Sequence, residues 1–259
     1  MVHTLNVVHL RVVPDDRRER SREKKRQRFL DGAQAVIDRD GVAGLTMQAV
    51  ADELDCAVGT IYTYFASKSA LLASLQARAV DTLRASFQTA QPAWQEAIAD
   101  EDLPAPLAAL VEAAAFGAFW AAASVVLADE FTLQRQLLTS KVTVLTADDV
   151  REVMPVALRL FEQPRALLAA AAAAGALAPG DELERVVRWL AAMDGVLLLD
   201  EVAPVDRHLF RGGHHARQFT ADLLVGWGAD RSEVEVAQTH VDRLAAMGPM
   251  APPPEVPTW

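Results

Sequence analysis

Cysteine and aromatic residues are scarce in this chain. Its 259 residues include one cysteine, Cys56, and aromatic side chains make up only 6% of the sequence. A single cysteine excludes a disulfide framework within the chain and favours a reducing compartment, so we expect a cytoplasmic protein. The first twelve residues alternate polar and apolar types without a hydrophobic run, and we therefore expect no secretory signal.

The sequence also lacks the motifs of several enzyme classes. We find no nucleophile elbow, phosphate-binding loop or His-Glu metal motif. His214 and His215 are adjacent, so they cannot both face one ion on a helix, and no cysteine or carboxylate cluster completes a site beside them. We expect these histidines in a loop with ordinary solvent contact, and we predict a protein without a metal, a cofactor or an enzymatic activity.

Negative charge is in excess, but it is unevenly distributed. The formal net charge is −10. Residues 1–68 contain 11 Lys or Arg and 10 Asp or Glu, whereas residues 69–259 contain 14 and 25. The acidity therefore belongs to the second part of the chain, where it favours solubility and discourages nonspecific contact with DNA.

Helical patterns account for most of the chain. Apolar residues make up 51% of the sequence, and many of them are alanine, which suits closely packed helices. No alternating run longer than four residues lies between turn signals in the body of the chain, so we predict an all-α protein. The expected helices cover residues 21–40, 47–54, 58–65, 68 to about 92, 104–127, 131–140, 147–174, 183–201, 216–227 and 232–247.

The most informative stretch runs from Thr46 to Lys68. In its first part, apolar residues fall at i, i+3, i+4 and i+7 on one face of a helix: Met47, Val50, Ala51 and Leu54. The segment 55–57 interrupts this pattern, and a second short helix follows in which Ile61 and Phe65 share one side. Two short helices joined by a tight turn form a helix-turn-helix, whose second helix can enter a DNA major groove.

The segment GTIYTYFASKSALL, residues 59–72, resembles the signature of TetR-like bacterial transcription regulators. The resemblance covers roughly fifty residues, from about Arg20 to Leu75. Its order Gly-Thr-hydrophobic-Tyr-x-Tyr-Phe-x-x-Lys combines positions that lie in the core, positions that contact DNA phosphates and positions that cap a helix. Two positions depart from the usual pattern: Asp55 replaces the customary turn glycine, and Ala57 replaces a common serine that caps the second helix. Asp tolerates the left-handed backbone of such a turn. The cap contact that Ala57 lacks is worth ~1 kcal/mol of helix stability.

The resemblance implies a three-helix helix-turn-helix head at the N-terminus, joined to a C-terminal helical bundle for ligand binding and dimerisation. We assign residues 1–19 to a flexible N-terminal extension and 20–67 to the DNA-binding head. Residues 68–248 form the effector-binding and dimerisation domain, and 249–259 form a disordered, proline-rich tail.

The resemblance also implies which residues contact DNA. Phosphate contacts are implied for Thr46, Tyr62, Tyr64 and Lys68, and Gly59 allows the backbone to approach DNA closely. The candidates for contact with base edges are Val58, Thr60, Tyr62 and Thr63. None of these is Arg, Lys, Asn or Gln, so strong bidentate readout of guanine or adenine is not available to this helix. For Tyr62 and Tyr64, aromatic packing within the head is the alternative.

A basic run lies just before the head, from Arg17 to Arg28, with eight Lys or Arg and two Glu. Such a run is either a solvated helix face or a source of phosphate and minor-groove contacts. Its position before a DNA-binding helix favours contact with DNA, and Arg22 and Arg26 are our candidates. We expect sequence preference to depend substantially on residues outside the recognition helix.

The most apolar segment, from Pro104 to Leu127, is long enough to cross a bilayer. It contains Glu112, nearly half of it is alanine, and its flanks are acidic instead of basic. We therefore predict a buried core helix and no membrane partner.

Aromatic and methionine residues gather on several of the expected body helices. At helical spacing such residues are more often plain core, but the resemblance implies a bundle that binds an apolar small molecule. Asp194 interrupts an otherwise apolar helix, and it is either a polar anchor for a ligand or a kink or interface residue. The candidate ligand-binding residues are Phe116, Phe119, Trp120, Phe131, Met154, Phe161, Trp189, Met193 and Asp194.

Two-fold operators require a two-fold protein, so we expect a homodimer. Segments 183–197 and 216–227 are apolar enough for a four-helix contact with their symmetry mates, although burial within one chain explains the same pattern. The sequence and the resemblance together predict a sequence-specific transcription regulator that binds double-stranded operator DNA. By family default it is a repressor released by a small apolar effector. The alternative is a helical ligand-binding or interaction protein with a degenerate DNA head.

Overall fold

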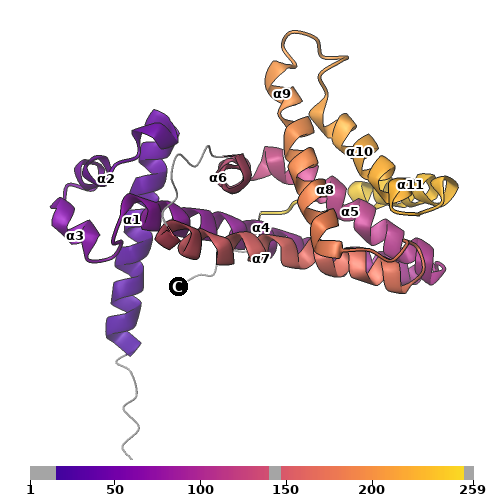
Figure 1. Ribbon diagram of the computed structural model, residues 1–259, viewed down its shortest axis with the longest axis horizontal. Coiled ribbons are helices and arrows are strands. Elements are labelled where there is room, and N and C mark those ends of the chain that lie inside the picture. Colours follow the sequence, from indigo (N-terminus) through magenta and orange to yellow (C-terminus); the bar gives the residue numbers. More distant parts are fainter. Residues whose placement is uncertain (1–15, 140–146, 254–259) are drawn as a thin grey trace, which may run out of the picture. The chain divides into compact units, whose positions relative to one another are not determined.

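The structure is a computed structural model that describes residues 16–139 and 147–253. Within these ranges the chain has eleven helices and no strand (Figure 1), which confirms the predicted all-α fold. The chain divides into two compact units, Met1–Leu75 and Gln76–Trp259. Most of the predicted extension, residues 1–15, and the end of the predicted tail, 254–259, lie outside the described residues.

The first unit has a small core built by three helices and the start of a fourth. These are α1 (Asp16–Gly44), α2 (Met47–Glu53), α3 (Val58–Tyr62) and the first turns of α4 (Lys68–Asp100). The apolar faces predicted for the two short helices are buried, except for the half-buried Leu54: Met47, Val50, Ala51, Ile61 and Phe65. From α1 the core receives Phe29, Ala33, Val36 and Ile37.

The two ends of α1 differ from the prediction in different ways. Gly41 breaks the helix where an end was expected, because its φ of 70° is a left-handed conformation that glycine adopts without strain. Helix nevertheless resumes and continues to Gly44. At the other end α1 begins at Asp16, so residues 16–19, assigned above to a flexible extension, are helical. This stretch contains Arg and Glu, which favour helix and extend the basic run upstream.

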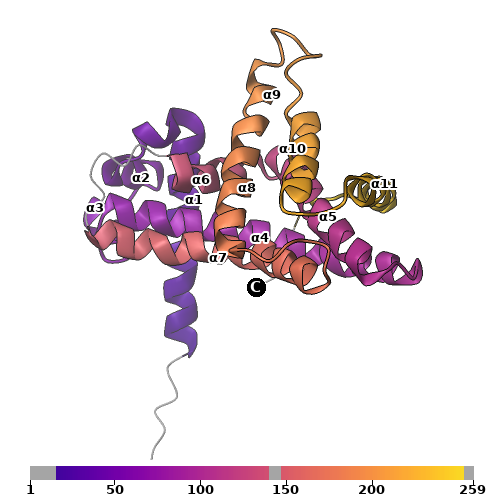
Figure 2. The ribbon, with the colours of Figure 1, turned by 45° about the vertical axis from the view of Figure 1, so that its right-hand side comes forward.

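The second unit contains the rest of α4 and seven further helices in its described part. They are α5 (Ala105–Val126), α6 (Ala128–Thr139), α7 (Ala147–Ala173), α8 (Glu182–Leu197), α9 (Leu199–Val202), α10 (Gly212–Gly226) and α11 (Arg231–Met247). α5 packs against α7, α10 and α11 (Figures 1 and 2). By length and composition α5 could span a membrane, but Leu110, Phe116 and Trp120 are among its buried residues. It is a core helix of this unit, as predicted.

α4 continues through Pro92, where the sequence predicted that this helix would fade. A proline inside a helix removes a backbone hydrogen bond and costs ~3 kcal/mol. Trp94 and Ile98 lie beyond the proline and are buried, so their packing stabilises the second part of the helix. α7 likewise continues through Pro155 and Pro164.

The start of the C-terminal tail is packed, contrary to the prediction. Met250 is 8% exposed and Ala251 is 1% exposed. The carbonyl oxygen of Pro252 accepts a hydrogen bond of 2.6 Å from Ser86 Oγ of α4. The proline content suggested disorder, but Met250 and Ala251 supply apolar surface that joins the hydrophobic core of the second unit.

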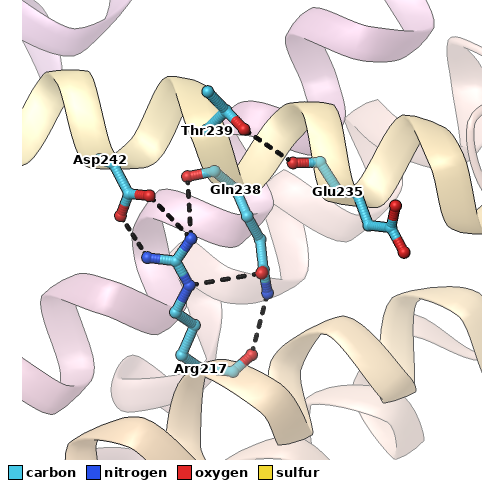
Figure 3. Close-up of polar contacts among 5 residues, drawn as sticks. All are labelled: Arg217, Glu235, Gln238, Thr239 and Asp242. Carbon is cyan, nitrogen blue, oxygen red and sulfur yellow. Dashed lines mark hydrogen bonds and ion pairs between the residues drawn. The ribbon is translucent and has the colours of Figure 1, made fainter.

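Arg217 of α10 holds α11 through a set of polar contacts (Figure 3). Its guanidinium makes two contacts with the Asp242 carboxylate, of which Nη2 to Oδ2 measures 2.9 Å. Gln238 Oε1 accepts from Arg217 Nε at 3.3 Å, and Gln238 Nε2 donates to the Arg217 carbonyl oxygen at 3.2 Å. The hydrogen bond from Arg217 lowers the pKa of Asp242. Because both side chains are partly exposed, we expect this pair to fix helix register and to contribute only ~0–1 kcal/mol.

Candidate functional site

The turn between α2 and α3 has the backbone that the sequence predicted. Asp55 has a φ of 48°, the left-handed conformation that Asp tolerates in place of glycine. Thr46 caps α2, because its Oγ1 accepts a hydrogen bond of 3.0 Å from the Ala49 amide. Ala57 precedes α3 and supplies no side-chain cap. The turn itself is held by backbone hydrogen bonds to α2, from the Asp55 amide to the Asp52 carbonyl oxygen at 3.3 Å and from the Cys56 amide to the Ala51 carbonyl oxygen at 2.9 Å.

α3 and the residues after it present an exposed polar face. Ile61 is fully buried and Phe65 is 2% exposed, so these two side chains anchor the helix to the head. Thr60, Tyr62 and Thr63 are exposed, with 52% of Tyr62 accessible. Thr63 Oγ1 donates to the Thr60 carbonyl oxygen at 2.6 Å. The face that the sequence predicted for base contact thus lies in solvent.

Val58 and Gly59 form the first turn of α3. Val58 is half-buried and Gly59 is exposed. A Cβ added at Gly59 would have no heavy atom of this chain within 4 Å outside its own helix. Packing within the chain therefore does not require glycine here, whereas close approach of a second molecule would.

The start of α4 combines two sources of positive potential. Ser67 caps the helix, because its Oγ accepts a hydrogen bond of 3.0 Å from the Ala70 amide. Lys68 is the first residue of α4 and is exposed, so its ammonium group adds to the positive end of the helix dipole. Tyr64 is half-buried with its ring centroid 5.0 Å from that of Phe29, so packing within the head accounts for its ring.

The two arginines predicted to contact DNA have different environments. Arg22 is exposed, and with Tyr64 it lines a surface hollow of about 310 Å³. Arg26 is half-buried: its Nη2 donates to Ser74 Oγ at 2.7 Å, and its guanidinium carbon lies 5.1 Å from the Phe65 ring centroid. Arg26 therefore ties α1 to α4, and because it also lines this surface hollow its predicted contact with DNA stays a prediction.

Most of the predicted ligand-binding rings form one buried cluster in the second unit. Ring centroids lie 5.9 Å apart for Phe116 and Trp120, and 5.3 Å apart for Phe116 and Trp189. Trp120 and Phe131 are 5.1 Å apart, and Phe116 and Phe119 are 6.0 Å apart. These five rings come from α5, α6 and α8, so the structure brings together residues that are distant in the sequence.

Two predicted residues of α7 do not join this ring cluster. Met154 is 50% exposed, and Leu158, one turn later, is 48% exposed. The buried face of α7 contains Val156 and Leu160, which come two residues after Met154 and Leu158 respectively. Met154 therefore lies outside the buried ring cluster, and its assignment as a ligand-binding residue stays a prediction. Phe161 is buried, but among the described ring contacts it has none with the cluster.

Asp194 is a buried polar group beside the rings. Its carboxylate is reached by Trp120 Nε1, which donates to Oδ1 at 3.0 Å, and by Gln134 Nε2, which lies 3.4 Å from both oxygens. Burial raises the pKa of Asp194 to about 6, although the hydrogen bonds from Trp120 and Gln134 act to lower it. α8 continues through Asp194 to Leu197, so this residue does not mark a kink.

Sequence reasoning missed two side chains of this core. Gln134 is fully buried and contacts Asp194 from α6. Its position three residues after Phe131 was a usable signal, because helical spacing places the two on one face. Phe87 of α4 lies with its ring 5.3 Å from Phe116 and 5.2 Å from Phe119.

Thr220 of α10 is a third buried residue that the sequence did not reveal. Its Oγ1 accepts from Trp189 Nε1 at 3.2 Å and donates to Met193 Sδ at 3.5 Å. This hydroxyl satisfies the indole of Trp189 and brings the predicted residue Met193 into the same polar contact.

A surface hollow lies close to Asp194. It has a volume of about 330 Å³ and is lined by Ser124, Val125, Ala128, Phe131, Thr132, Arg135, Leu197, Asp200 and Glu201. Phe131 precedes Gln134 by one helical turn, and Leu197 follows Asp194 by one turn. Asp194 and Gln134 do not line the hollow themselves, but each lies one helical turn from a residue that does.

The paired histidines lie in a helix, contrary to the predicted loop. His214 and His215 occupy the first turn of α10, which begins at Gly212. The Gly212 amide donates to Asp200 Oδ1 at 2.7 Å, and this contact lets the helix start ahead of the histidines. In the described part of the chain no group of three or more His, Cys, Asp or Glu is placed to hold a metal ion.

Comparison with known proteins finds a likeness within the first unit. The family model of bacterial regulatory proteins, tetR family, matches residues 29–75. The HTH-type transcriptional repressor KstR of Rhodococcus jostii (strain RHA1) is 42% identical over 64 residues, which cover 25% of this chain and 30% of that protein. The repressor of the same name from Mycobacterium tuberculosis (strain ATCC 25618 / H37Rv) is 43% identical over 58 residues, or 22% of this chain and 26% of that protein. The chain thus spans about a third or less of the length of these relatives.

A solved structure resembles most of the chain. RolR in complex with the ligand resorcinol superimposes with a TM-score of 0.52 and 17% sequence identity, covering 87% of this chain and 96% of that one. At this identity the likeness concerns the fold alone.

Proposed function

We propose that the chain is a regulator of the TetR family, which represses transcription by binding operator DNA until a small effector releases it. The observation that carries this proposal is the exposed polar face formed by Thr60, Tyr62 and Thr63 over the buried anchors Ile61 and Phe65. Such a face on the second helix of a helix-turn-helix fits the major groove. The protein would act in the cytoplasm.

In this proposal, phosphates and bases are contacted by different groups. The α4 N-terminus with Lys68, the exposed Arg22 and the hydroxyls of Thr46, Tyr62 and Tyr64 bind phosphates, whereas Arg26 holds the head together. Val58, Thr60 and Thr63 offer methyl groups to thymine, and Tyr62 also reaches base edges. Because none of these side chains makes a bidentate contact, DNA shape and the basic start of α1 supply much of the sequence preference.

Dimerisation in this proposal uses an apolar stripe on α8 and α9. Leu183, Val187, Leu198 and Val202 are between 36% and 42% exposed, and the exposed Ala191 and Gly195 lie between them. The spacing of three or four residues places them along one side of the helices. Small residues at the centre allow close approach of a symmetry mate, which would supply the second head for a two-fold operator.

Effector release in this proposal acts through α4. This helix begins in the first unit and continues into the second, where Phe87 contacts Phe116 and Phe119. A ligand that rearranges the ring cluster therefore also acts on α4. The effector must bind the DNA-incompetent arrangement more tightly, and reversing a 99:1 preference takes a ~10⁴-fold difference in affinity.

The proposal is tested by selecting DNA from a random double-stranded pool with the purified protein at near-physiological salt. We expect enrichment of a two-fold symmetric site with half-sites ~34–36 Å apart. Tyr62→Ala should lose the enrichment without unfolding the head, because its side chain is 52% exposed. Val236→Ala, on α11 with 45% exposure, is the matched control and should select the same site.

A second function has one feature in its favour. The recognition helix carries no charged side chain and lacks a side-chain cap at Ala57, as in a head that has lost DNA binding. If the folded, dimeric protein enriches no site, the repressor proposal is wrong, and a helical ligand-binding protein becomes the better interpretation.

A further inference from the structure

Two buried hydrogen-bond acceptors meet where α5, α6 and α8 join. The Asp194 carboxylate has room for about four donors, and it receives donors from Trp120 and Gln134. The Oε1 atom of Gln134 is buried and has no partner among the described residues. An unpaired buried acceptor is unfavourable, so this site has capacity for a donor that comes from outside the described chain.

The same carboxylate has no cation at ion-pair distance within the described ranges. Arg135 of α6 acts on it electrostatically, but the guanidinium of Arg135 lies 3.4 Å from Glu201, with which it forms an ion pair. A buried carboxylate without a bonded cation is strongly disfavoured in an apolar interior. Asp194 therefore favours an incoming group that carries positive charge as well as hydrogen-bond donors.

Aromatic rings form the surroundings of this carboxylate. Trp120 donates a hydrogen bond to it, and the ring centroids of Phe131 and Trp120 lie 5.1 Å apart. Both rings are almost fully buried. Ring faces attract cations, and more strongly where water is excluded. The rings also provide apolar surface for the body of a ligand.

We propose that the Asp194–Gln134 site binds a protonated amine with an apolar body, and that this class includes the effector. The ammonium group donates one N–H to the Asp194 carboxylate and another to Gln134 Oε1, and its charge pairs with Asp194. The apolar body lies against Trp120 and Phe131. The role as effector rests on the repressor function proposed above, whereas the binding site does not.

The neighbouring hollow provides an approach with matching charge. It is lined by Phe131 and Leu197, each one turn from a polar anchor. Its charged lining consists of Asp200 and Glu201 against Arg135, so acidic groups are in excess. This balance favours a cation over an anion at the entrance. Rotation of Phe131, which lines the hollow and contacts Trp120, would extend the hollow toward the carboxylate.

The test compares ligands of one shape that differ in charge and donors. The probes are 2-phenylethylamine, its N,N,N-trimethyl derivative, 2-phenylethanol and 3-phenylpropanoate, measured by calorimetry and thermal unfolding of the full chain at pH 7.5. We expect the amine to bind at least tenfold more tightly than the alcohol and the acid. The trimethyl compound should bind more weakly than the amine, because it has no N–H for Gln134.

Variants locate the site. D194N should lose the tenfold preference for the amine, and Gln134→Met should weaken amine binding while keeping the preference for positive charge. Asp222→Asn, an exposed aspartate of α10 in the same unit, is the matched control and should bind like the parent. Thermal unfolding of each variant without ligand shows that it is folded.

Several results would overturn the assignment. These are the absence of amine binding at millimolar concentration, equal binding of the amine and the alcohol, or an unchanged preference in D194N. DNA release is measured separately. An amine that binds at Asp194 but leaves the protein on its selected operator contradicts the effector role alone. A protein that selects no operator contradicts the repressor function, and the binding data still decide the site.

Discussion

Asp194 should destabilise the folded protein at neutral pH, and replacing it with asparagine should remove this effect. The side chain is 2% exposed and has hydrogen bonds but no ion pair in the described part of the chain. Asparagine has the same shape and no charge. Its amide oxygen can accept from Trp120, and its amide nitrogen can donate to Gln134 Oε1 once the Gln134 amide turns over, because Nε2 faces the carboxylate in the parent. D194N therefore keeps the Trp120 contact, exchanges the Gln134 contact and loses the buried charge.

The magnitude follows from the two pKa values of the carboxyl group. Burial raises the pKa of Asp194 to about 6 in the folded protein, against 3.8 for the ordinary side chain. Between these values the folded state binds more protons than the unfolded state, so the free energy of unfolding falls as pH rises. Above pH 6 the loss is complete and corresponds to ~3 kcal/mol. Below pH 3.8 the carboxyl group is neutral in both states, and the penalty is absent.

Denaturant unfolding at pH 7.5 and pH 4.5 measures this effect. D194N should be more stable than the parent by up to ~3 kcal/mol at pH 7.5, and the difference should shrink to ~1 kcal/mol at pH 4.5. Asp222→Asn, at an exposed position, should show neither change. A D194N variant that is less stable than the parent at pH 7.5 would refute the reasoning, because the carboxylate would then be a stabilising, compensated charge. A stability difference that does not change with pH would refute it as well.

Three further substitutions test other parts of the structure. Gly59→Ala should leave the head at least as stable, because the added methyl meets no atom of the chain within 4 Å and alanine favours helix, yet it should weaken operator binding in a gel-shift titration. Phe87→Ala should lower the free energy of unfolding by ~3–5 kcal/mol, since it removes a buried ring in contact with Phe116 and Phe119; a loss no larger than that of the exposed Val236→Ala would contradict this. Ser86→Ala should lower it by ~1 kcal/mol and expose the segment after Gly248 to proteolysis, because the hydroxyl bonds the Pro252 carbonyl; unchanged proteolysis would show that the contact does not hold the segment.

The head was predictable because its determinants are local. Thr46 caps α2 by accepting a hydrogen bond from an amide only three residues away, and Asp55 turns the chain by its own backbone conformation. The burial of Ile61 and Phe65 follows from spacing within one short segment. Each of these features depends on a few neighbouring residues, so a sequence pattern carries it. The base-contacting and phosphate-contacting assignments remain predictions, because exposure alone does not identify what a side chain binds.

The failures share a dependence on residues far away in the sequence. α4 passes Pro92 because Trp94 and Ile98 are buried against the body, and Met250 is ordered because it enters the same core. Arg26 belongs to a basic run, and no local pattern showed that Ser74, 48 residues later, accepts a hydrogen bond from it. Composition describes a segment's own tendencies, and it does not report the partner that a tertiary fold supplies.

The energetic cost of the buried Asp194 carboxylate distinguishes a binding site from an ordinary hydrophobic core. Domains of this kind are stable by only ~5–15 kcal/mol, so ~3 kcal/mol from one carboxylate is a large fraction of the total. Well-packed apolar groups in place of buried charge are often neutral or stabilising, so the fold itself gives no reason for the carboxylate here. A bound ammonium group would pair with the charge and lower the pKa of Asp194 again. The ligand would thus recover the stability that the unliganded protein lacks, which is why an amine should raise the unfolding temperature of the parent chain more than that of D194N.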